Sequence, residues 1–561
     1  MIAYVELSLG GSSHDLADPA EKEFLESLTF IVLEVGLKTS HEDILFGHIY
    51  EKFVESGVET IFLDSLTSHI LDGSVKRTLT APVVNAYIDR QVTGGHIALV
   101  EQVLTYLDVS ILDLNFVTKV CLTHRLFSGL IYLYTEAFKD WKTPAFELLK
   151  IVRQFTDISA KHPEWTPDNI PDQEARSLRD NCYQFMVYLA YTWTGKAYPV
   201  GLIPEEDQVK AKTSLYTLIF SETFTDNDCT TAPSPPLVHC IFYTYSPTLF
   251  FPAVVKKELP FPYLRLLINF DFIELLRVLT AAFDDPSLND LITMWPLTVD
   301  LSASDEKSPP PAFLNRQTIV DILLRLVAHP LGDFSVDKKA TLFIFIAKNM
   351  SRHESLVTVN KKNFETILTS LTSSSDTASK KEKQQALLDL LKVYRPSEVE
   401  YEKLILLCEN ARYFKVCEEI YRRLKRYQLI LHCYMDDESR KLEVFRGIKE
   451  LLGDPKIDEE SRTKLKKTVV ASIPDLIKID GTETATLVLQ EFSEEHNNVM
   501  QKLEAFPNLQ YQYLRGFLNH NSKKSGETRA PESPEMHEKY LELMCKLEPV
   551  MVYKYLQTTE K

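Results

Sequence analysis

Gly195-Lys196 carries the glycine and lysine of a phosphate-binding loop. Such a loop also needs an upstream glycine, so that backbone amides can surround the phosphate, and a Ser or Thr after the lysine to hold Mg²⁺. The upstream glycine is missing and Ala197 follows the lysine. The G-x-S-x-G elbow of hydrolases and the HExxH of zinc proteases are also absent. We expect Gly94-Gly95-His96 to form a turn between helices.

The cysteines are the next residues that could hold a metal ion. His432-Cys433 lies downstream of Cys408 and Cys417, but spacings of nine and sixteen residues are not those of a zinc site. The chain has eight cysteines, widely scattered and without a CxxC pair. Most have apolar helical neighbours, which favours reduced, buried thiols in a cytosolic protein over metal ligands. The cysteines are Cys121, Cys182, Cys229, Cys240, Cys408, Cys417, Cys433 and Cys545.

Paired carboxylates could transfer protons, and three such groups occur in the sequence. All of them stand where a helix is expected to begin or end, and open backbone N–H groups and the helix dipole favour acidic residues there. We therefore interpret them as caps and not as general acids or bases. They are Asp271 with Glu274, Asp284 with Asp285, and Asp436 with Asp437.

Two further clusters admit a binding role. Lys380, Lys381 and Lys383 could contact anionic lipid, but we predict a solvated polar loop there. Pro309-Pro310-Pro311 could be a polyproline ligand, but a stiff loop is the preferred interpretation. We predict no catalytic residue, no metal site and no cofactor, and thus a protein that is not an enzyme.

Helices must position nearly all of these residues. The chain of 561 residues is 45% hydrophobic, contains only 17 glycines, and has too many residues for one core. In YLRLLINFDFIELLRVLTAAFDDP, Asp271 can cap a helix and Glu274 can complete a capping box. The preceding helix should run from about Pro262 to Asn269. Residues at helical spacing should then form a buried stripe: Phe272, Leu275, Leu276, Leu279 and Phe283.

The N-terminal segment DPAEKEFLESLTFIVLEVGL follows the same rules. Asp18 is the expected N-cap, Pro19 the first helical residue, and Gly36 the terminator. We expect one apolar face, formed by Phe24, Leu28, Ile31, Val32 and Val35.

A series of short helices is expected near the C-terminal third, at 398–410, 412–424, 427–435 and 438–452. Short helices with apolar faces and very short joins must stack on their neighbours, which is typical of an α-solenoid. No strict sequence period is present, so the repeat is degenerate. The expected stripes are Phe414, Cys417, Ile420 and Tyr421, then Ile430, Cys433 and Tyr434, then Leu442, Phe445, Ile448 and Leu452.

Segments rich in Pro, Ser or charge should be loops, since they cannot pack a core. These are 162–177, 227–237, 304–311, 372–385 and 521–535. They divide the helical body into solenoid blocks at 1–161, 178–303, 312–371 and 386–520, with a loosely attached helix at 536–561 after a disordered linker.

The net charge is −17, which disfavours a nucleic-acid binder because phosphate contacts need clustered Lys and Arg. The N-terminus has no basic region followed by an apolar core, so no signal peptide is expected. No apolar run approaches the roughly 20 residues of a membrane span. Membrane association is therefore expected to go through partners or surface contact.

Specific residues add a family resemblance. Residues 60–155 contain LFSGLIYLY (126–134) and TPAFELL (143–149), and this region resembles the central region of the vacuolar protein sorting-associated protein 8 family. The stretch 260–290 looks like the family segment in which LL-x-FD precedes a helix with an acidic-Pro end, and 395–455 is similar to its clathrin-type repeat. The matching features of the first region are Leu107-Asp108, Leu112-Asp113, Val120-Cys121, His124, LFSGLIYLY (126–134) and TPAFELL (143–149); those of the last are Phe414, Val416-Cys417, Tyr421, Tyr427, Cys433-Tyr434 and Arg440.

The resemblance implies an all-α solenoid of clathrin-heavy-chain-type helix pairs in a subunit of the CORVET endosomal tethering complex. It implies vesicle tethering and endosome-to-vacuole or lysosome transport, with class C core subunits and an endosomal Rab-family GTPase as partners. The family also has an N-terminal β-propeller and a C-terminal RING domain, and we expect neither in this sequence. The alternatives are a subunit of the related HOPS complex, another clathrin-repeat adaptor, or an enzyme with a site between distant helices. No small-molecule substrate is expected.

Overall fold

The computed structural model divides into two compact units, Met1–Asp333 and Phe334–Lys561, which we describe separately. The residues that it describes are 2–10, 18–165, 169–221, 259–289, 292–294, 312–329, 334–354, 356–373, 379–522 and 534–559.

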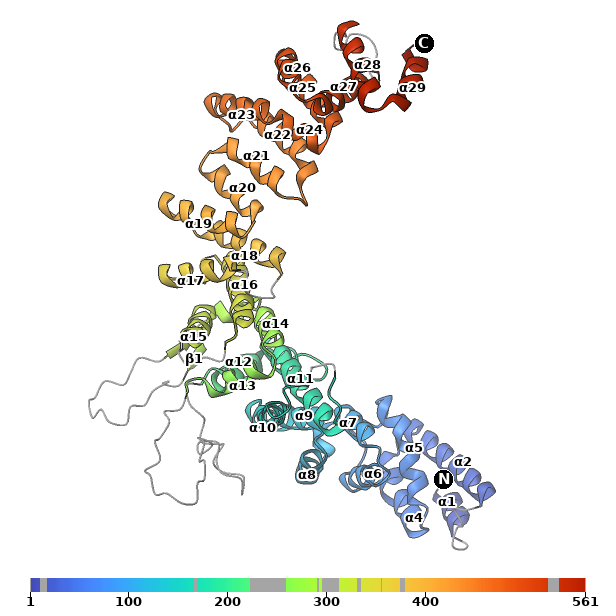
Figure 1. Ribbon diagram of the computed structural model, residues 1–561. Helices are drawn as coiled ribbons and strands as arrows, with labels where there is room; N and C mark the ends of the chain where they lie inside the picture. The colour runs from blue at the N-terminus through green and yellow to red at the C-terminus, as the bar shows by residue number, and fades with distance from the viewer. Residues whose placement is uncertain are drawn as a thin grey trace, which may run out of the picture. The chain divides into compact units, whose positions relative to one another are not determined.

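The first part of unit 1 is a run of helices that each pack on their sequence neighbours. In this run α5 contacts α2, α4, α6 and α7, and α9 contacts α7 and α8 (Figure 1). The helices are α1 (Ile2–Leu9), α2 (Pro19–Lys38), α3 (Glu42–Ile44), a π-helical turn (Leu45–Ile49), α4 (Tyr50–Glu55), α5 (Glu59–Leu71), α6 (Ala81–Thr93), α7 (Ile97–Tyr106), a 3₁₀ turn (Val109–Ile111), α8 (Leu114–His124) and α9 (Phe127–Ala137).

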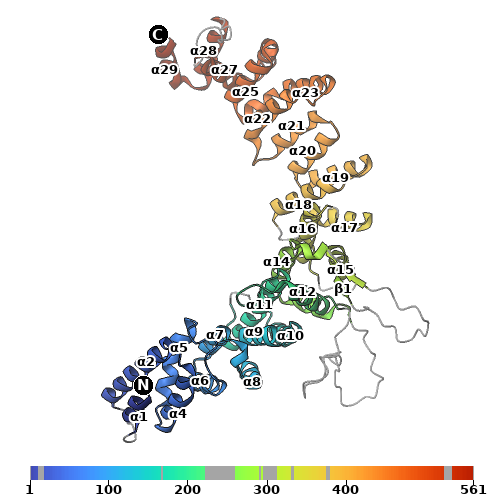
Figure 2. The same cartoon turned by 180° about the vertical axis from the view of Figure 1, so that it is seen from behind.

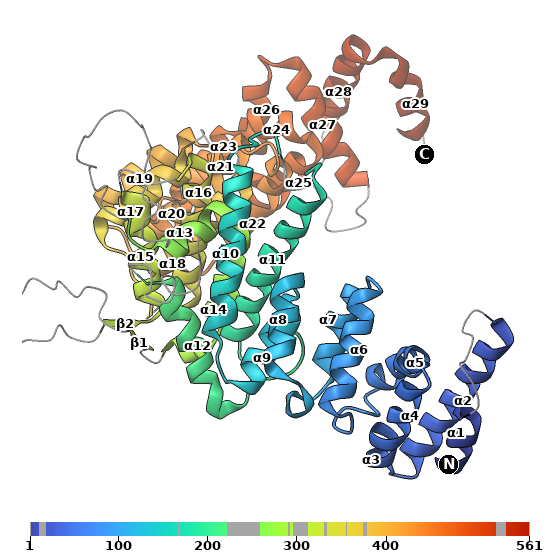
Figure 3. The same cartoon turned by 90° about the horizontal axis from the view of Figure 1, so that it is seen from below.

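The rest of unit 1 is built on two helix pairs. Figure 3 shows the long helices α10 and α11 side by side; α10 also packs on α13, and α11 on α14. A short antiparallel ribbon, in which Ile292 pairs with Leu314, is a local exception to the helical fold. The elements are α10 (Lys142–Ser159), α11 (Gln173–Trp193), α12 (Glu205–Ile219), α13 (Pro262–Phe270), α14 (Phe272–Phe283), a 3₁₀ turn (Pro286–Asn289), β1 (Ile292–Met294), β2 (Ala312–Leu314) and α15 (Arg316–Ala328).

Unit 2 continues the same design of short stacked helices, which Figure 2 shows from behind. Contacts between helices one or two places apart in the chain dominate, such as α20 with α21, α16 with α18, and α25 with α27. The helices are α16 (Val336–Arg352), α17 (Lys361–Thr372), α18 (Lys380–Val393), α19 (Glu398–Asn410), α20 (Phe414–Arg423), α21 (Tyr427–Asp436), a 3₁₀ turn (Lys441–Glu443), α22 (Val444–Gly453), α23 (Glu459–Ala471), α24 (Ile473–Ile479), α25 (Gly481–Glu491), a 3₁₀ turn (Ser493–Glu495), α26 (His496–Leu503), α27 (Pro507–Ser522), α28 (Pro534–Leu547) and α29 (Pro549–Thr559).

The predicted all-α solenoid is therefore confirmed, and the stripe from Phe272 to Phe283 is buried as expected. The face predicted for α2 is partly wrong. Phe24, Ile31 and Val35 are exposed, whereas Leu25 and Leu33 are buried. The helix also continues past the predicted terminator Gly36 to Lys38, and Gly36 is a packing position, since a Cβ atom there would lie 2.9 Å from Leu45 Cδ2.

Three other predictions need correction. The stretch 162–177 was expected to be a loop, but α11 begins at Gln173. Leu442 was expected in the core, but it lies in a 3₁₀ turn and is exposed. Two helices, α28 and α29, stand where one loose helix was predicted, and stacking of Tyr511 on Tyr540 attaches α28 to α27. The predicted loops 227–237 and 304–311 lie outside the described residues.

Candidate partner-binding surface

The acidic residue at the start of α14 is a cap that also ties two helices together. Asp271 Oδ1 accepts a hydrogen bond from the Glu274 amide at 3.0 Å, and Oδ2 accepts one from the Tyr183 hydroxyl of α11 at 2.8 Å. The predicted capping box also needs the Glu274 carboxylate to accept a hydrogen bond from the Asp271 amide, and this bond is not formed. The Asp271 amide donates to the Leu267 carbonyl instead, and the Glu274 carboxylate forms an ion pair with Arg277.

The acidic residues after α14 also have structural roles. Asp285 Oδ2 lies 2.8 Å from the buried Lys212 Nζ of α12, and Oδ1 accepts a hydrogen bond from the Ser287 amide. Burial alone would raise the pKa of Asp285, but hydrogen bonds from Lys212 and Ser287 hold it below its usual value. The Arg316 side chain of α15 donates to the carbonyls of Phe283 and Asp285 at 2.8 and 2.7 Å. The corner therefore joins α12, α14 and α15.

The cysteine cluster of unit 2 belongs to the helix core, as predicted. Cys408, Cys417 and Cys433 are buried, whereas the neighbouring His432 is exposed. A hydrogen bond with Cys408 and burial raise the pKa of Cys417, and burial raises that of Cys433. Across the part of the chain that the structure describes, no three His, Cys, Asp or Glu side chains lie close enough to hold a metal ion.

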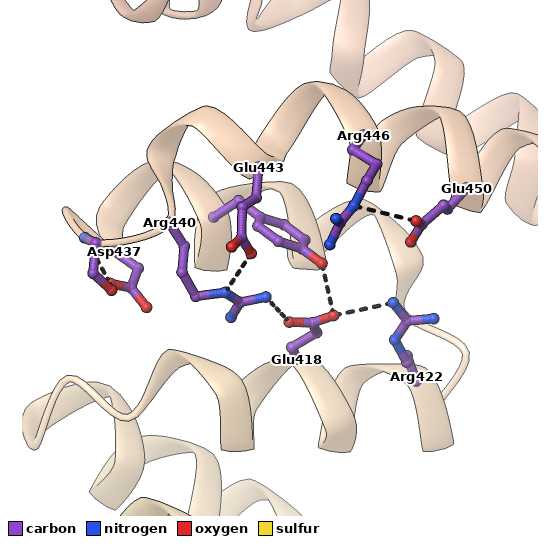
Figure 4. Close-up of polar contacts among 9 residues, drawn as sticks. Glu418, Arg422, Asp437, Arg440, Glu443, Arg446 and Glu450 are labelled. Atoms are coloured by element: carbon purple, nitrogen blue, oxygen red, sulfur yellow. Dashed lines mark hydrogen bonds and ion pairs between the residues drawn. The ribbon is translucent and has the colours of Figure 1, made fainter. Parts of the chain in front are cut away.

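A polar network centred on Glu418 fastens α20 to α21 and to the turn before α22 (Figure 4). The carboxylate accepts hydrogen bonds from Arg440 at 2.7 Å, Tyr434 at 2.9 Å and Arg422 at 3.0 Å. Burial would raise the pKa of Glu418, but the two arginines hold it below the usual value. Arg440 also lies over the Tyr434 ring, 4.4 Å from its centroid. Glu418 was not singled out in the sequence, because two of its three partners, Tyr434 and Arg440, lie outside its own helix.

The lysine cluster was wrongly placed in a loop. Lys380, Lys381 and Lys383 lie in the first turn of α18, and Lys383 is buried, with its Nζ donating to the Ser373 carbonyl at 2.8 Å. Lys383 is therefore not on a surface that contacts lipid. Asp436 ends α21 and Asp437 follows it, in agreement with their predicted position at a helix end.

The two glycine-containing sites that the sequence offered, Gly195-Lys196 and Gly94-Gly95, lie at helix ends. Gly195 follows α11 with a φ of +80°, and its amide donates to the Thr192 carbonyl at 3.1 Å. The Lys196 Nζ lies 5.9 Å from the centroid of the Tyr191 ring. Gly94 and Gly95 form the predicted turn after α6. The Pro309–Pro311 run lies outside the described residues.

The Leu-Asp pairs of the family-like region combine a core residue with a cap. Leu107 and Leu112 are buried; Asp108 caps the 3₁₀ turn, and Asp113 caps α8 through the amides of residues 115 and 116. A Cβ atom on Gly129 would lie 3.0 Å from Leu104 Cδ1, so α7 and α9 approach closely here as predicted.

An open groove between α10 and α13 is the surface feature that sequence reasoning missed. It has a volume of about 510 Å³. Phe146 of α10 meets Tyr263 of α13 at a ring separation of 6.0 Å, and further along Phe155 meets Phe270 at 5.7 Å. The helices thus run in the same direction, with an apolar floor between them. Only the helical spacing on α10 signalled this face, because α13 lies about a hundred residues later in the chain.

Comparisons with known proteins identify relatives over most of the chain. Residues 61–283 match the family described as Vps8 central TPR. The vacuolar protein sorting-associated protein 8 homolog of Mus musculus is 26% identical over 542 residues, 96% of this chain and 34% of the relative. The Drosophila melanogaster homolog is 25% identical over 511 residues, 90% of this chain and 34% of the relative. The Saccharomyces cerevisiae protein is 22% identical over 436 residues, 76% of this chain and 31% of the relative.

The chain thus spans about a third of the length of the curated relatives that it matches. The resemblance predicted from the residues is confirmed. Among the helices of the described residues, none combines the length and the apolar character that crossing a membrane requires.

Proposed function

Because the chain is a relative of vacuolar protein sorting-associated protein 8 and carries that family's central TPR region at residues 61–283, we propose that it is a scaffold subunit in vacuolar protein sorting. More specifically, we propose a non-enzymatic role in a CORVET-like complex that tethers vesicles for fusion and for endosome-to-vacuole or lysosome transport. The observation that carries the proposal is the similarity of this chain, over 96% of its length, to the vacuolar protein sorting-associated protein 8 homolog of Mus musculus.

The fold supports a scaffold role. Each helix packs mainly on its neighbours, and such stacks offer a long surface to several partners at once. The carboxylates that could have served as acids and bases are used instead as caps and ion pairs, as at Asp271 and Asp285. The proposed partners are class C core subunits and an endosomal Rab-family GTPase. These partners would place the chain peripherally on endosomal membranes from the cytoplasm.

Co-purification tests the choice of complex. The tagged chain is expressed in cells and its partners are identified by mass spectrometry, with the tag alone as control. We expect the class C core subunits together with subunits specific to CORVET. Recovery of HOPS-specific subunits in their place would contradict the CORVET assignment and favour a HOPS role.

A further inference from the structure

We propose that the groove between α10 and α13 docks one amphipathic α-helix of a partner protein, held by large apolar side chains and by acidic residues along one flank. The groove would dock such a helix in whichever complex the chain belongs to. Peptide binding and co-purification therefore test separate statements.

The floor of the groove is apolar and already packed. Leu149, Phe155 and Tyr263 are buried and form its base, while Leu266 and Phe270 of α13 are half-buried and line one wall. A preformed apolar base costs little reorganisation when a ligand covers it, because the side chains are held by the T-shaped contacts between α10 and α13. The accessible edges of Leu266 and Phe270 are the area that a ligand would remove from water.

The length and direction of the groove fit a helix. At 1.5 Å per residue, its α10 side runs about 21 Å from Phe146 to Ala160, and its α13 side runs about 12 Å from Pro262 to Phe270. Two parallel helices with an apolar trough between them can receive a third, whose anchors recur at i, i+4 and i+7. A docked helix of about 14 residues would follow the whole α10 side and would contact α13 over about two turns.

The charges on the α10 rim select an acidic ligand. Lys150 and Arg153 line the groove, in a chain whose net charge is −17. Their partners are on the same helix: Lys150 lies 2.8 Å from Glu147, and Arg153 lies 3.9 Å from Asp157. Each pair has one exposed member and contributes little to the stability of the fold, so a ligand carboxylate can join Lys150 or Arg153 at small cost. Acidic residues along one flank of the docked helix would meet both cations.

The direction of the docked helix follows from the same geometry. Since α10 and α13 are parallel, both of their positive N-terminal ends lie at one end of the groove and both negative C-terminal ends at the other, where Asp157 adds a carboxylate. A docked helix that runs antiparallel to them places its own ends against charges of opposite sign. The groove therefore favours the antiparallel orientation.

A pair of synthetic peptides tests the proposal on the full chain. The first is a fluorescein-labelled helical 14-mer with leucines at i, i+4 and i+7 and glutamates on one flank; the second has lysines in place of the glutamates. Fluorescence anisotropy measures binding. We expect the acidic peptide to bind at least about tenfold more tightly than the basic one, a difference of about 1.4 kcal/mol.

Charge-reversed variants locate the site. Lys150→Glu combined with Arg153→Glu is expected to weaken binding of the acidic peptide at least about tenfold and to strengthen binding of the basic one. Lys76→Glu and Lys119→Glu change exposed lysines outside the groove and should leave both affinities unchanged. Circular dichroism verifies that each variant is folded. Absence of binding, equal binding of both peptides, or unchanged binding to the double variant would each overturn the proposal.

Discussion

The ammonium group of Lys212 lies 2.8 Å from a carboxylate oxygen of Asp285, and the two side chains are only 6% and 13% exposed. They are 73 residues apart in sequence and join α12 to the turn after α14. Two buried charges in contact have each given up hydration, so their value to the fold depends on both being present. The acidic-Pro end of α14 is thus a joint between helices.

Removal of one partner should loosen this joint. Asp285→Ala leaves Lys212 buried without a counter-charge, and we expect a loss of about 3–5 kcal/mol in the stability of unit 1. Hydrogen exchange of the α12 and α14 amides, measured by mass spectrometry, should become faster. The matched control is Asp284→Ala at the exposed neighbouring position, with an expected loss of about 1 kcal/mol or less. Equal exchange in the two variants would contradict a special role for Asp285.

The Glu418 network should make unit 2 sensitive to acid. The pKa of Glu418 is lowered in the folded chain, so its stabilisation is complete at neutral pH and is lost as the pH falls through that lowered pKa. Glu418→Gln cannot form the ion pairs with Arg440 and Arg422. The thermal midpoint of the wild type should therefore exceed that of the variant at pH 7, and the gap should narrow below about pH 4.

An exposed ion pair on α22 supplies the control for this measurement. Glu450 lies 3.3 Å from Arg446 and is 60% exposed. Glu450→Gln should change the midpoint little at any pH, since exposed pairs contribute little. A gap for Glu418→Gln that does not depend on pH would show that the loss comes from packing and not from charge.

Local signals predicted much of the helical architecture. The caps at Asp18 and Asp271 and the stripe from Phe272 to Phe283 are encoded within a few residues, and the structure confirms them. Three helices, α19, α20 and α21, were also placed within two residues of their observed ends, because short apolar stripes and turns bracket each one. The fourth was predicted from residue 438, but α22 begins at Val444, after the 3₁₀ turn Lys441–Glu443.

The buried faces and the joints between helices were less predictable. On α2 the stripe was displaced, so that Phe24 was assigned to the core in place of Leu25. A solenoid helix contacts more than one neighbour, so its buried face is set by elements that the local sequence does not specify. The same reason explains why the Lys212–Asp285 ion pair and the α10–α13 groove were not predicted. In each case the two sides come from distant segments of the chain.

Gly129 allows the close packing of α7, α8 and α9. A Cβ atom there would lie 3.0 Å from Leu104 Cδ1 and 3.2 Å from Cys121 Sγ. Gly129→Leu should destabilise this region by about 1–3 kcal/mol through overpacking. Gly47→Leu is the control, because nothing lies within 4 Å of its Cβ position. Thermal unfolding and limited proteolysis near α8 should distinguish the Gly129→Leu variant from the Gly47→Leu variant. Equal unfolding midpoints and equal cleavage rates in the two variants would show that the helices are not tightly packed at Gly129.

Thiol labelling tests the burial of the cysteines. Burial raises the pKa of Cys121 to about 12 and also raises that of Cys182, so few thiolates are available there to react. Cys545 on α28 is exposed. In a chain that carries Cys229→Ser and Cys240→Ser, a maleimide at pH 7.5 should label Cys545 within minutes and the buried thiols only after urea is added. Peptide mass spectrometry identifies the labelled positions. Labelling of Cys121 or Cys182 as fast as Cys545 would show that these helices open readily in the native chain.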